Sequence, residues 1–187
     1  MHIIYVHGFN STGTGSDKYL MLVDRFGKDH VSTLDLPYAP MQAIAALEDL
    51  IAEINKNDDN IILVGTSLGG FYATYLSRKQ LLKCVLINPA IDPYVTTRRY
   101  LGENTNYGSG LSYTFTMNEV EGFKPYYVTL AETPKVPTLV FLDAGDEILD
   151  HKKATEHFAG YAQIRVFEGG SHRFSHMIDT LEDIAKL

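Results

Sequence analysis

The chain has 187 residues, of which 45% are hydrophobic and 21% charged, which is enough for one domain with a sizeable core. Its net charge of -7 makes nucleic acid an unexpected partner, because phosphate backbones attract basic surfaces. No segment has the length of a membrane span, and the first apolar run is too short for a signal peptide. The only cysteine, Cys84, cannot form an internal disulfide, and we therefore expect a cytoplasmic protein.

Six short apolar runs predict buried β-strands. Most of them are continuous rather than alternating in polarity, which is typical of a parallel sheet that is covered on both faces. The runs are Ile3–Val6, Val31–Leu34, Ile61–Val64, Cys84–Ile87, Thr138–Leu142 and Ile164–Phe167.

Stretches with helical spacing separate these runs. They are Asp17–Phe26, Met41–Ile54, Leu68–Lys79, His151–Phe158 and Phe174–Ala185. The alternation of strand and helix predicts a single α/β domain over residues 1–187. We expect a compact, doubly wound fold with a mostly parallel sheet of about six strands and helices on both of its faces.

One segment, residues 92–137, interrupts the alternation between the fourth and fifth strands. It is rich in Tyr, Thr, Gly and Asn and shows no clear strand. A connection this long inside a compact domain is usually functional. We predict a short cap insertion with one or two short helices, and an irregular surface excursion is the alternative.

The third predicted strand runs directly into Gly65-Thr66-Ser67-Leu68-Gly69, and a predicted helix follows at once. A Gly-x-Ser-x-Gly turn between a strand and a helix is the nucleophile elbow of α/β-hydrolases. The strained turn lifts the serine hydroxyl above the sheet, and glycines on either side prevent a clash between strand and helix. Ser67 is therefore the predicted nucleophile.

A serine nucleophile needs a base, and the base needs an acid that fixes its tautomer. In this fold the histidine comes last, and His172 lies in a glycine-rich loop after the last predicted strand. His176 is the rival, and the spacing of the two histidines would also suit a metal site on a helix. No glutamate lies between them and no third ligand is obvious, so we expect neither a metal nor an organic cofactor.

Four carboxylates after the fifth predicted strand compete for the role of the acid. Asp143 lies at the strand end and is expected to face away from the site, whereas Glu147 is expected to point to solvent. Asp150 suits a helix N-cap. Asp146 lies in the turn and precedes an apolar pair, residues 148–149, that would anchor the loop. We predict Asp146 as the acid.

Two backbone amides are predicted to form the oxyanion hole for the tetrahedral intermediate. Leu68, directly after the nucleophile, supplies one amide, and Phe9, in the loop after the first strand, supplies the other because Gly8 lets the backbone turn inward. His7 is expected to hold this loop by hydrogen bonds rather than to act as a base. Residues 11–16 are glycine-rich but match no nucleotide-binding motif, and they are interpreted as an entrance to the site.

With these residues in place, the chain resembles the YqiA/YcfP-type esterases, a small branch of the α/β-hydrolase superfamily. The resemblance implies a compact hydrolase that acts on simple carboxylic or thioester acyl groups, and it implies the triad Ser67, Asp146 and His172. The matching motifs span nearly the whole chain in the right order and are Tyr5–Ser11, Gly65–Ala73, Leu86–Ala90, Leu101–Asn104, Gly145–Asp150 and Gly170–His172.

The sequence therefore predicts a serine carboxylesterase that cleaves small acyl esters through an acyl-enzyme intermediate. A thioesterase that acts on acyl-CoA or an acyl carrier uses the same machinery. Arg98 and Arg99 could meet its anionic leaving group, although paired arginines are more often solvated surface. An inactive hydrolase-like binding module is the alternative that is not an enzyme, but such modules usually lack one member of the triad. The expected partner is a small-molecule acyl ester or thioester, and the oligomeric state stays open.

Overall fold

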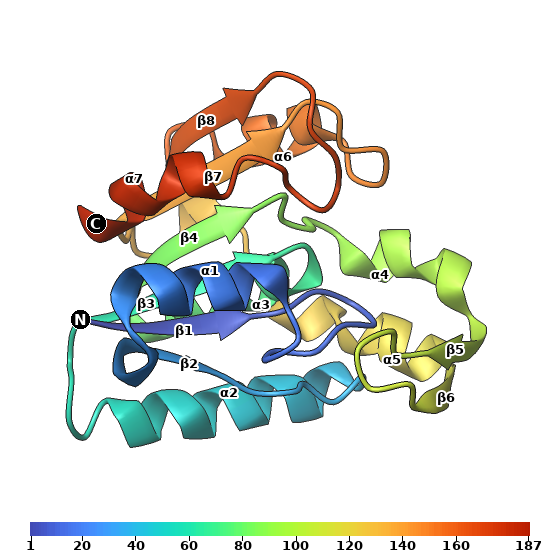
Figure 1. Ribbon diagram of the computed structural model, residues 1–187. Coiled ribbons are helices and arrows are strands. Elements are labelled where there is room, and N and C mark those ends of the chain that lie inside the picture. Colours follow the sequence, from blue (N-terminus) through green and yellow to red (C-terminus); the bar gives the residue numbers. More distant parts are fainter.

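The structure, a computed structural model, describes all 187 residues and contains a six-stranded sheet in which every neighbouring pair of strands is parallel (Figure 1). The strands lie in the order β2-β1-β3-β4-β7-β8. This confirms the predicted mostly parallel sheet. The bounds are β1 His2–Val6, β2 Val31–Thr33, β3 Ile61–Thr66, β4 Lys83–Ile87, β7 Thr138–Asp143 and β8 Gln163–Phe167.

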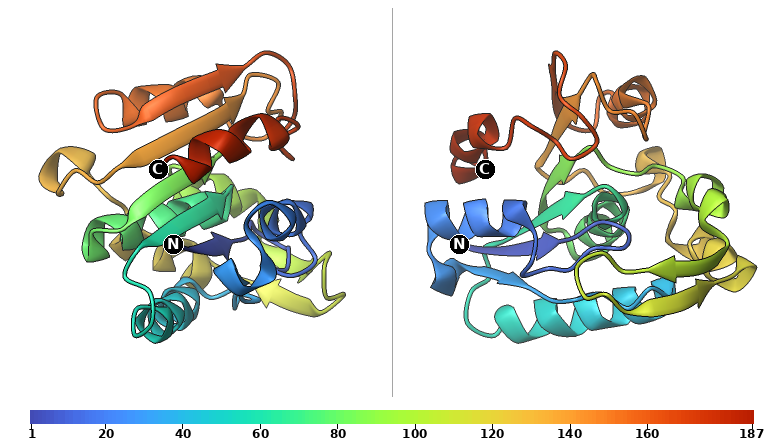
Figure 2. Two further views of the ribbon diagram at one scale, coloured as in Figure 1. Left: turned by 60° about the vertical axis from the view of Figure 1, so that its left-hand side comes forward. Right: turned by 45° about the vertical axis from the view of Figure 1, so that its right-hand side comes forward.

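Helices cover both faces of this sheet, as expected (Figure 2). One face packs against α1 and α7, and the other packs against α2, α3 and α6. No helix is both long enough and apolar enough to cross a membrane. The bounds are α1 Asp17–Phe26, α2 Pro40–Ile54, α3 Leu68–Gln80, α6 His151–Phe158 and α7 Leu181–Ala185, with single 3-10 turns at Lys28–His30 and Ile178–Thr180.

The strands send alternate side chains into two separate cores. In β1, Ile4 and Val6 belong to the core shared with α2 and α3, whereas Ile3 and Tyr5 belong to the core shared with α1. Because both faces are buried, the apolar runs are continuous in the sequence. Each fully buried aliphatic side chain of this size contributes about 1.5–3 kcal/mol, so the two cores together stabilise the sheet.

The last predicted helix begins later than expected. Regular helical structure starts at Ile178, and not at Phe174 as the sequence suggested. Phe174 has a φ of 59°, which a helix does not allow. The backbone N–H of Ser175 donates to the Asp143 carboxylate in place of a helical hydrogen bond, and the side chain of His176 is hydrogen-bonded to the same carboxylate.

The segment between β4 and β7 contains a hairpin that the sequence did not reveal. Its strands are antiparallel, with Gly102 opposite Phe115. They are short and mostly exposed, so they lack the apolar pattern that marks a strand. The elements of the segment are α4 Pro93–Thr96, β5 Gly102–Thr105, β6 Ser112–Phe115 and α5 Met117–Gly122, with 3-10 turns at Thr97–Tyr100, Lys124–Tyr126 and Leu130–Glu132.

The hairpin lies beyond the carboxyl ends of the parallel strands and contacts the loop after β1 (Figure 1). The Tyr107 N–H donates to the Asn10 carbonyl at 2.9 Å, and the Asn106 side chain donates to the Ser11 carbonyl at 2.8 Å. Phe115 of β6 is buried, with its ring 5.2 Å from that of Phe9. These contacts hold the hairpin over the end of the sheet that carries the predicted site.

Candidate active site

Ser67 lies in the sharp turn between β3 and α3 and has a φ of 51° and a ψ of -120°. Such a backbone is strained for any residue with a side chain and persists only where its surroundings hold it. A Cβ atom at Gly65 would lie 2.4 Å from the Gly69 carbonyl oxygen, and one at Gly69 would lie 2.0 Å from the Val6 carbonyl oxygen. The two glycines are therefore required by close packing. The neighbour that excludes a side chain at Gly69 is β1, and not β3 as the sequence suggested.

The structure brings the side chains of Ser67, His172 and Asp146 together in one hydrogen-bonded chain. His172 Nε2 lies 3.0 Å from Ser67 Oγ, and His172 Nδ1 lies 2.8 Å and 3.0 Å from the two carboxylate oxygens of Asp146. A proton on Nδ1 is donated to the carboxylate, which leaves the Nε2 lone pair facing the serine hydroxyl. This geometry suits removal of the Ser67 proton.

Burial and backbone hydrogen bonds fix the position of Asp146. Its side chain is 2% exposed, and that of His172 is 18% exposed. The N–H groups of Ile148 and Leu149 both donate to Asp146 Oδ1 at 2.8 Å. The apolar pair that was expected to anchor this loop therefore also supplies its backbone donors.

Glu147 has a contact that sequence reasoning missed. Its side chain is exposed, as expected, but Oε2 accepts a hydrogen bond of 2.9 Å from the His172 backbone N–H. This hydrogen bond is the main reason why the pKa of Glu147 lies below its usual value. The residue next to the predicted acid thus fixes the backbone of the predicted base.

Asn88, at the end of β4, connects the two loops that carry Asp146 and His172. Its side-chain amide donates to the Ser171 carbonyl at 3.0 Å, and its side-chain oxygen accepts from the Asp143 N–H at 2.9 Å. Asn88 adopts a φ of 41°. The only sequence signal for this role was that Asn88 is a polar residue at the carboxyl end of a buried strand.

The two rejected candidates, Asp143 and His176, form a second carboxylate–histidine pair. Asp143 is completely buried, and its Oδ1 lies 2.6 Å from His176 Nδ1. The imidazole of His176 stacks on the ring of Phe167 at 4.7 Å. Neither His172 nor His176 lies in a helix, so the shared helical face considered as a metal site does not exist.

Asp150 lies at the end of the loop after β7, here called the acid loop, and His7 lies at the start of the loop after β1, here called the oxyanion loop. Asp150 caps α6 by accepting from the Lys152 N–H at 2.9 Å, which confirms its structural role. His7 Nδ1 lies 2.8 Å from the Gly8 carbonyl oxygen, and its Nε2 accepts from the Leu36 N–H at 2.9 Å. Burial lowers the pKa of His7, so its ring is neutral and holds the loop, as expected.

The two predicted oxyanion donors both lie close to Ser67. Leu68 is the first residue of α3, so its N–H has no acceptor within the helix. The Phe9 N–H donates to no other backbone carbonyl. A Cβ atom at Gly8 would lie only 3.2 Å from Ser67 Cβ, which places this loop directly beside the serine.

A cavity of about 590 Å³, here called the serine cavity, is lined by Ser67 and His172. Residues 8–12 of the loop after β1 and residues 148–149 of the loop after β7 also line it. Its other charged lining residues are Asp17, Lys18, Arg99 and Arg173, so positive charge is in excess. Arg99 forms no ion pair, whereas its neighbour Arg98 pairs with Glu121 at 3.5 Å, outside the cavity.

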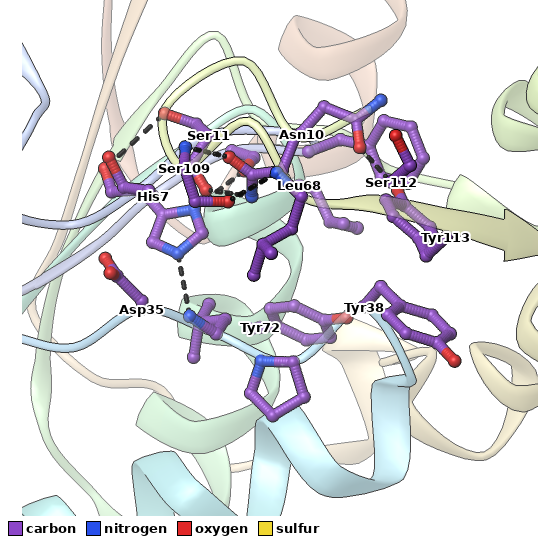
Figure 3. A pocket seen from close by; sticks show the side chains of 17 residues that line it. His7, Asn10, Ser11, Asp35, Tyr38, Leu68, Tyr72, Ser109, Ser112 and Tyr113 are labelled. Carbon is purple, nitrogen blue, oxygen red and sulfur yellow. Dashed lines mark hydrogen bonds between the residues drawn. The ribbon is translucent and has the colours of Figure 1, made fainter. Parts of the chain in front are cut away.

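A second cavity of about 440 Å³, here called the tyrosine cavity and drawn in Figure 3, shares lining residues with the first. Gly8, Phe9 and Leu68 line both cavities, but Ser67 and His172 line only the serine cavity. The oxyanion loop therefore separates two spaces of different chemistry.

Comparisons with known proteins agree with this fold. The model of an uncharacterised protein family, UPF0227, matches residues 2–187. One member, the UPF0227 protein YcfP of Escherichia coli O9:H4 (strain HS), is 23% identical over 187 residues, which cover 97% of this chain and 96% of that protein. The family resemblance inferred from the motifs is thereby confirmed.

Similar solved structures include the alpha/beta hydrolase domain-containing protein 10 from mouse, which is 16% identical with a TM-score of 0.75 over 99% of this chain and 89% of that one. The monoacylglycerol lipase of Paleococcus ferrophilus is 17% identical with a TM-score of 0.72 over 98% of this chain and 92% of that one. Likeness at this level of identity establishes a shared α/β-hydrolase fold.

Proposed function

This chain belongs to the uncharacterised protein family UPF0227 and has an α/β-hydrolase fold, and we propose that it acts as a serine carboxylesterase. One observation carries the proposal, namely that His172 lies between the other two side chains. Its Nε2 is 3.0 Å from Ser67 Oγ, and its Nδ1 is 2.8 Å from Asp146 Oδ2. Residues 1–187 form one hydrolase domain in this proposal.

In the first step, Ser67 Oγ attacks the ester carbonyl carbon while His172 Nε2 takes the serine proton. Asp146 holds the imidazole in the required tautomer and stabilises its positive form. The amides of Leu68 and Phe9 donate to the oxyanion, and each such donor is worth about 100-fold or more in rate. His172 then gives its proton to the departing alcohol oxygen, which leaves an acyl group on Ser67.

In the second step, water takes the place of the alcohol. His172 removes a proton from the water as it attacks the acyl carbon, and a second tetrahedral oxyanion forms at the same two amides. Its collapse releases a carboxylic acid and returns the proton to Ser67. The residues named complete both steps.

The segment of residues 92–137 is proposed to act as a cap on the substrate. Arg99, Tyr100 and Tyr107 of this segment line the serine cavity, and the hairpin is hydrogen-bonded to the oxyanion loop. A cytoplasmic location suits a chain whose only cysteine, Cys84, is buried.

A thioesterase is the second candidate, and the charge of the serine cavity favours it. Lys18, Arg99 and Arg173 line the same cavity as His172, which would protonate the leaving group. The phosphates of a coenzyme A leaving group would meet these cations. Comparing turnover of a simple oxygen ester with that of the matched acyl-CoA distinguishes the two, because Arg99→Gln should raise KM only for the acyl-CoA.

Turnover of a series of para-nitrophenyl esters tests the proposal as a whole. The wild type should hydrolyse short members of the series, and Ser67→Ala should lose this activity while its circular dichroism spectrum and thermal unfolding stay the same. Activity that persists in purified Ser67→Ala would exclude Ser67 as the nucleophile. A folded wild type with no activity toward oxygen esters or thioesters would instead favour an inactive binding module.

A further inference from the structure

The tyrosine cavity has walls that differ from those of the serine cavity. The rings of Tyr38, Tyr72 and Tyr113 line it, together with apolar side chains that include Leu36 and Leu111. Its only carboxylate belongs to Asp35, and it contains neither lysine nor arginine. The cavity is therefore aromatic and carries no cation that would attract an anion.

Tyr72 points an unpartnered hydroxyl at this cavity. The residue is 1% exposed, and its hydroxyl forms no hydrogen bond with any other group of the protein. Figure 3 shows this hydroxyl directed toward Tyr38, across the cavity. Burial raises the pKa of Tyr72, so the group stays protonated and can donate. Arg78 Nε is the only buried side-chain nitrogen or oxygen without a partner, so the Tyr72 hydroxyl oxygen is open to the cavity and is free to donate to a ligand there.

The wall opposite Tyr72 is held in place by contacts with the oxyanion loop. The Tyr113 hydroxyl donates to the Asn10 side chain, and the Tyr113 ring stacks on that of Tyr38 at 4.4 Å. Asn10 directly follows Phe9 and adopts a φ of 53°. The cavity is thus formed before any ligand binds, and its wall is attached to the loop that carries a proposed oxyanion donor.

The position of His172 decides which part of an ester would enter this cavity. His172 must protonate the leaving group, and it lines only the serine cavity. The leaving group therefore lies in the serine cavity. The carbonyl is held at Leu68 and Phe9, which line both cavities, so the acyl group extends to the other side of the oxyanion loop.

We propose that the tyrosine cavity binds the acyl group of the substrate, and that Tyr72 donates a hydrogen bond to its far end. This inference rests on the proposed ester hydrolysis at Ser67. The substrate class is an ester or thioester of an uncharged acyl group with a ring and a hydroxyl or similar acceptor. Asp35 disfavours acyl groups that end in a carboxylate, because like charges repel in a space without lysine or arginine to compensate them.

Two pairs of para-nitrophenyl esters test this assignment. One pair carries phenylacetyl groups and the other carries phenylpropanoyl groups, and in each pair one member has a para-hydroxyl on the ring. In at least one pair, the wild type should prefer the hydroxylated member by about tenfold in kcat/KM, the value of one well-placed hydrogen bond. Tyr72→Phe removes only the hydroxyl and should abolish this preference.

Tyr75→Phe is the matched control, because Tyr75 lies on the same helix, packs against Tyr126 and does not line the cavity. It should keep the wild-type preference. The assignment is overturned if neither pair shows a preference, or if the preference persists in Tyr72→Phe. The acyl group of para-nitrophenyl acetate has no ring and does not need the tyrosine cavity. Its turnover therefore tests the proposed function at Ser67 separately from the assignment of the cavity. Acetate turnover should be equal in wild type and Tyr75→Phe and absent in Ser67→Ala.

Asp35→Asn gives an independent measurement. The Asp35 carboxylate accepts a hydrogen bond of 2.7 Å from the Gly13 N–H, and an asparagine oxygen can replace this acceptor. The variant should raise several-fold the ratio of kcat/KM for a phenylacetyl ester with a para-carboxylate to kcat/KM for the uncharged ester. An equal effect on both esters would contradict binding of the acyl group beside Asp35.

Discussion

Asp143 Oδ1 lies 2.6 Å from His176 Nδ1, and this pair fixes the loop that carries His172. The other carboxylate oxygen of Asp143 accepts from the N–H groups of Ser171 and Ser175, at 3.1 Å and 2.8 Å. Asp143 therefore binds backbone groups on both sides of His172 without contacting Ser67. It is a positioning residue in the proposed mechanism, and it lies one turn before the acid itself.

Replacing Asp143 by Asn should lower kcat with little change in KM. The amide keeps the size of the carboxylate but is uncharged and has only one acceptor oxygen, so it cannot reproduce the hydrogen bonds both to the backbone N–H groups and to His176, and the loop is held less firmly. A misplacement of about 1 Å in a catalytic group costs about 100-fold in rate. The free energy of unfolding should also fall by about 2 kcal/mol, because bonds to a buried charge are lost.

Asp150→Asn is the control for this variant, because asparagine also caps helices well. It makes the same chemical change at the start of α6 and should leave kcat unchanged. Steady-state kinetics and urea unfolding measure both variants. If Asp143→Asn loses stability but keeps its kcat, Asp143 supports the fold and does not position His172.

Asp146→Asn should reduce kcat/KM by about 1000-fold or more, because the amide favours the wrong tautomer of the base. The asparagine oxygen can still accept from the Ile148 and Leu149 N–H groups, so the loop should stay in place. Ester turnover, with thermal unfolding as the control for folding, measures the effect. Turnover within tenfold of wild type would assign the acid role to another residue.

The lowered pKa of His7 leads us to expect that the protein loses stability on acidification. Burial lowers its pKa in the folded state from 6.5, so the unfolded state binds a proton at pH values where the folded state does not. The free energy of unfolding should therefore decrease as the pH falls below about 6.5 and should be independent of His7 above about pH 7.5.

His7→Gln isolates this contribution, because glutamine can accept from the Leu36 N–H but does not titrate. His2 and His157 also have pKa values lowered mainly by burial, and they remain in both proteins. Urea unfolding near pH 7.5 and pH 5.5 should show a smaller pH dependence in the variant. An equal dependence would mean that His7 binds a proton equally well in the folded and the unfolded state, which would contradict the lowered pKa.

Gly69→Ala should destabilise the protein by about 3 kcal/mol or more, because the added methyl group would overlap the Val6 carbonyl. Gly122→Ala is the matched control, since its Cβ would meet only the Pro40 side chain at 3.5 Å, an ordinary contact. Urea midpoints compare the two variants. Similar stability for both would show that β1 and α3 can move apart.

Local sequence patterns predicted most of the strands and helices, because apolar residues occupy the positions whose side chains are buried. The bounds of α1 and α6 agree with expectation, since their apolar spacing and flanking residues are local signals. The hairpin with Gly102 and Phe115 was missed because its strands pair with each other and expose most side chains. Phe174 was wrongly placed in a helix because its backbone depends on Asp143, which is distant in the sequence.

The site shows the same division between local and distant signals. Ser67, Asp146 and His172 were found from their order and from the loops they occupy, and the structure brings them together, while their catalytic roles remain a prediction. The contacts of Asn88 and Glu147 could not be found, because each joins a side chain to a backbone group of another loop. No periodicity in the sequence encodes such a pair.

Covalent labelling with a fluorophosphonate tests the central claim most directly, because this probe reacts with a serine only when a base has activated it. Peptide mass spectrometry then locates the adduct. One adduct per chain on Ser67 is expected, with labelling slowed at least 100-fold in His172→Gln. An intact, folded protein that stays unlabelled, or that carries the adduct on another residue, would contradict the account.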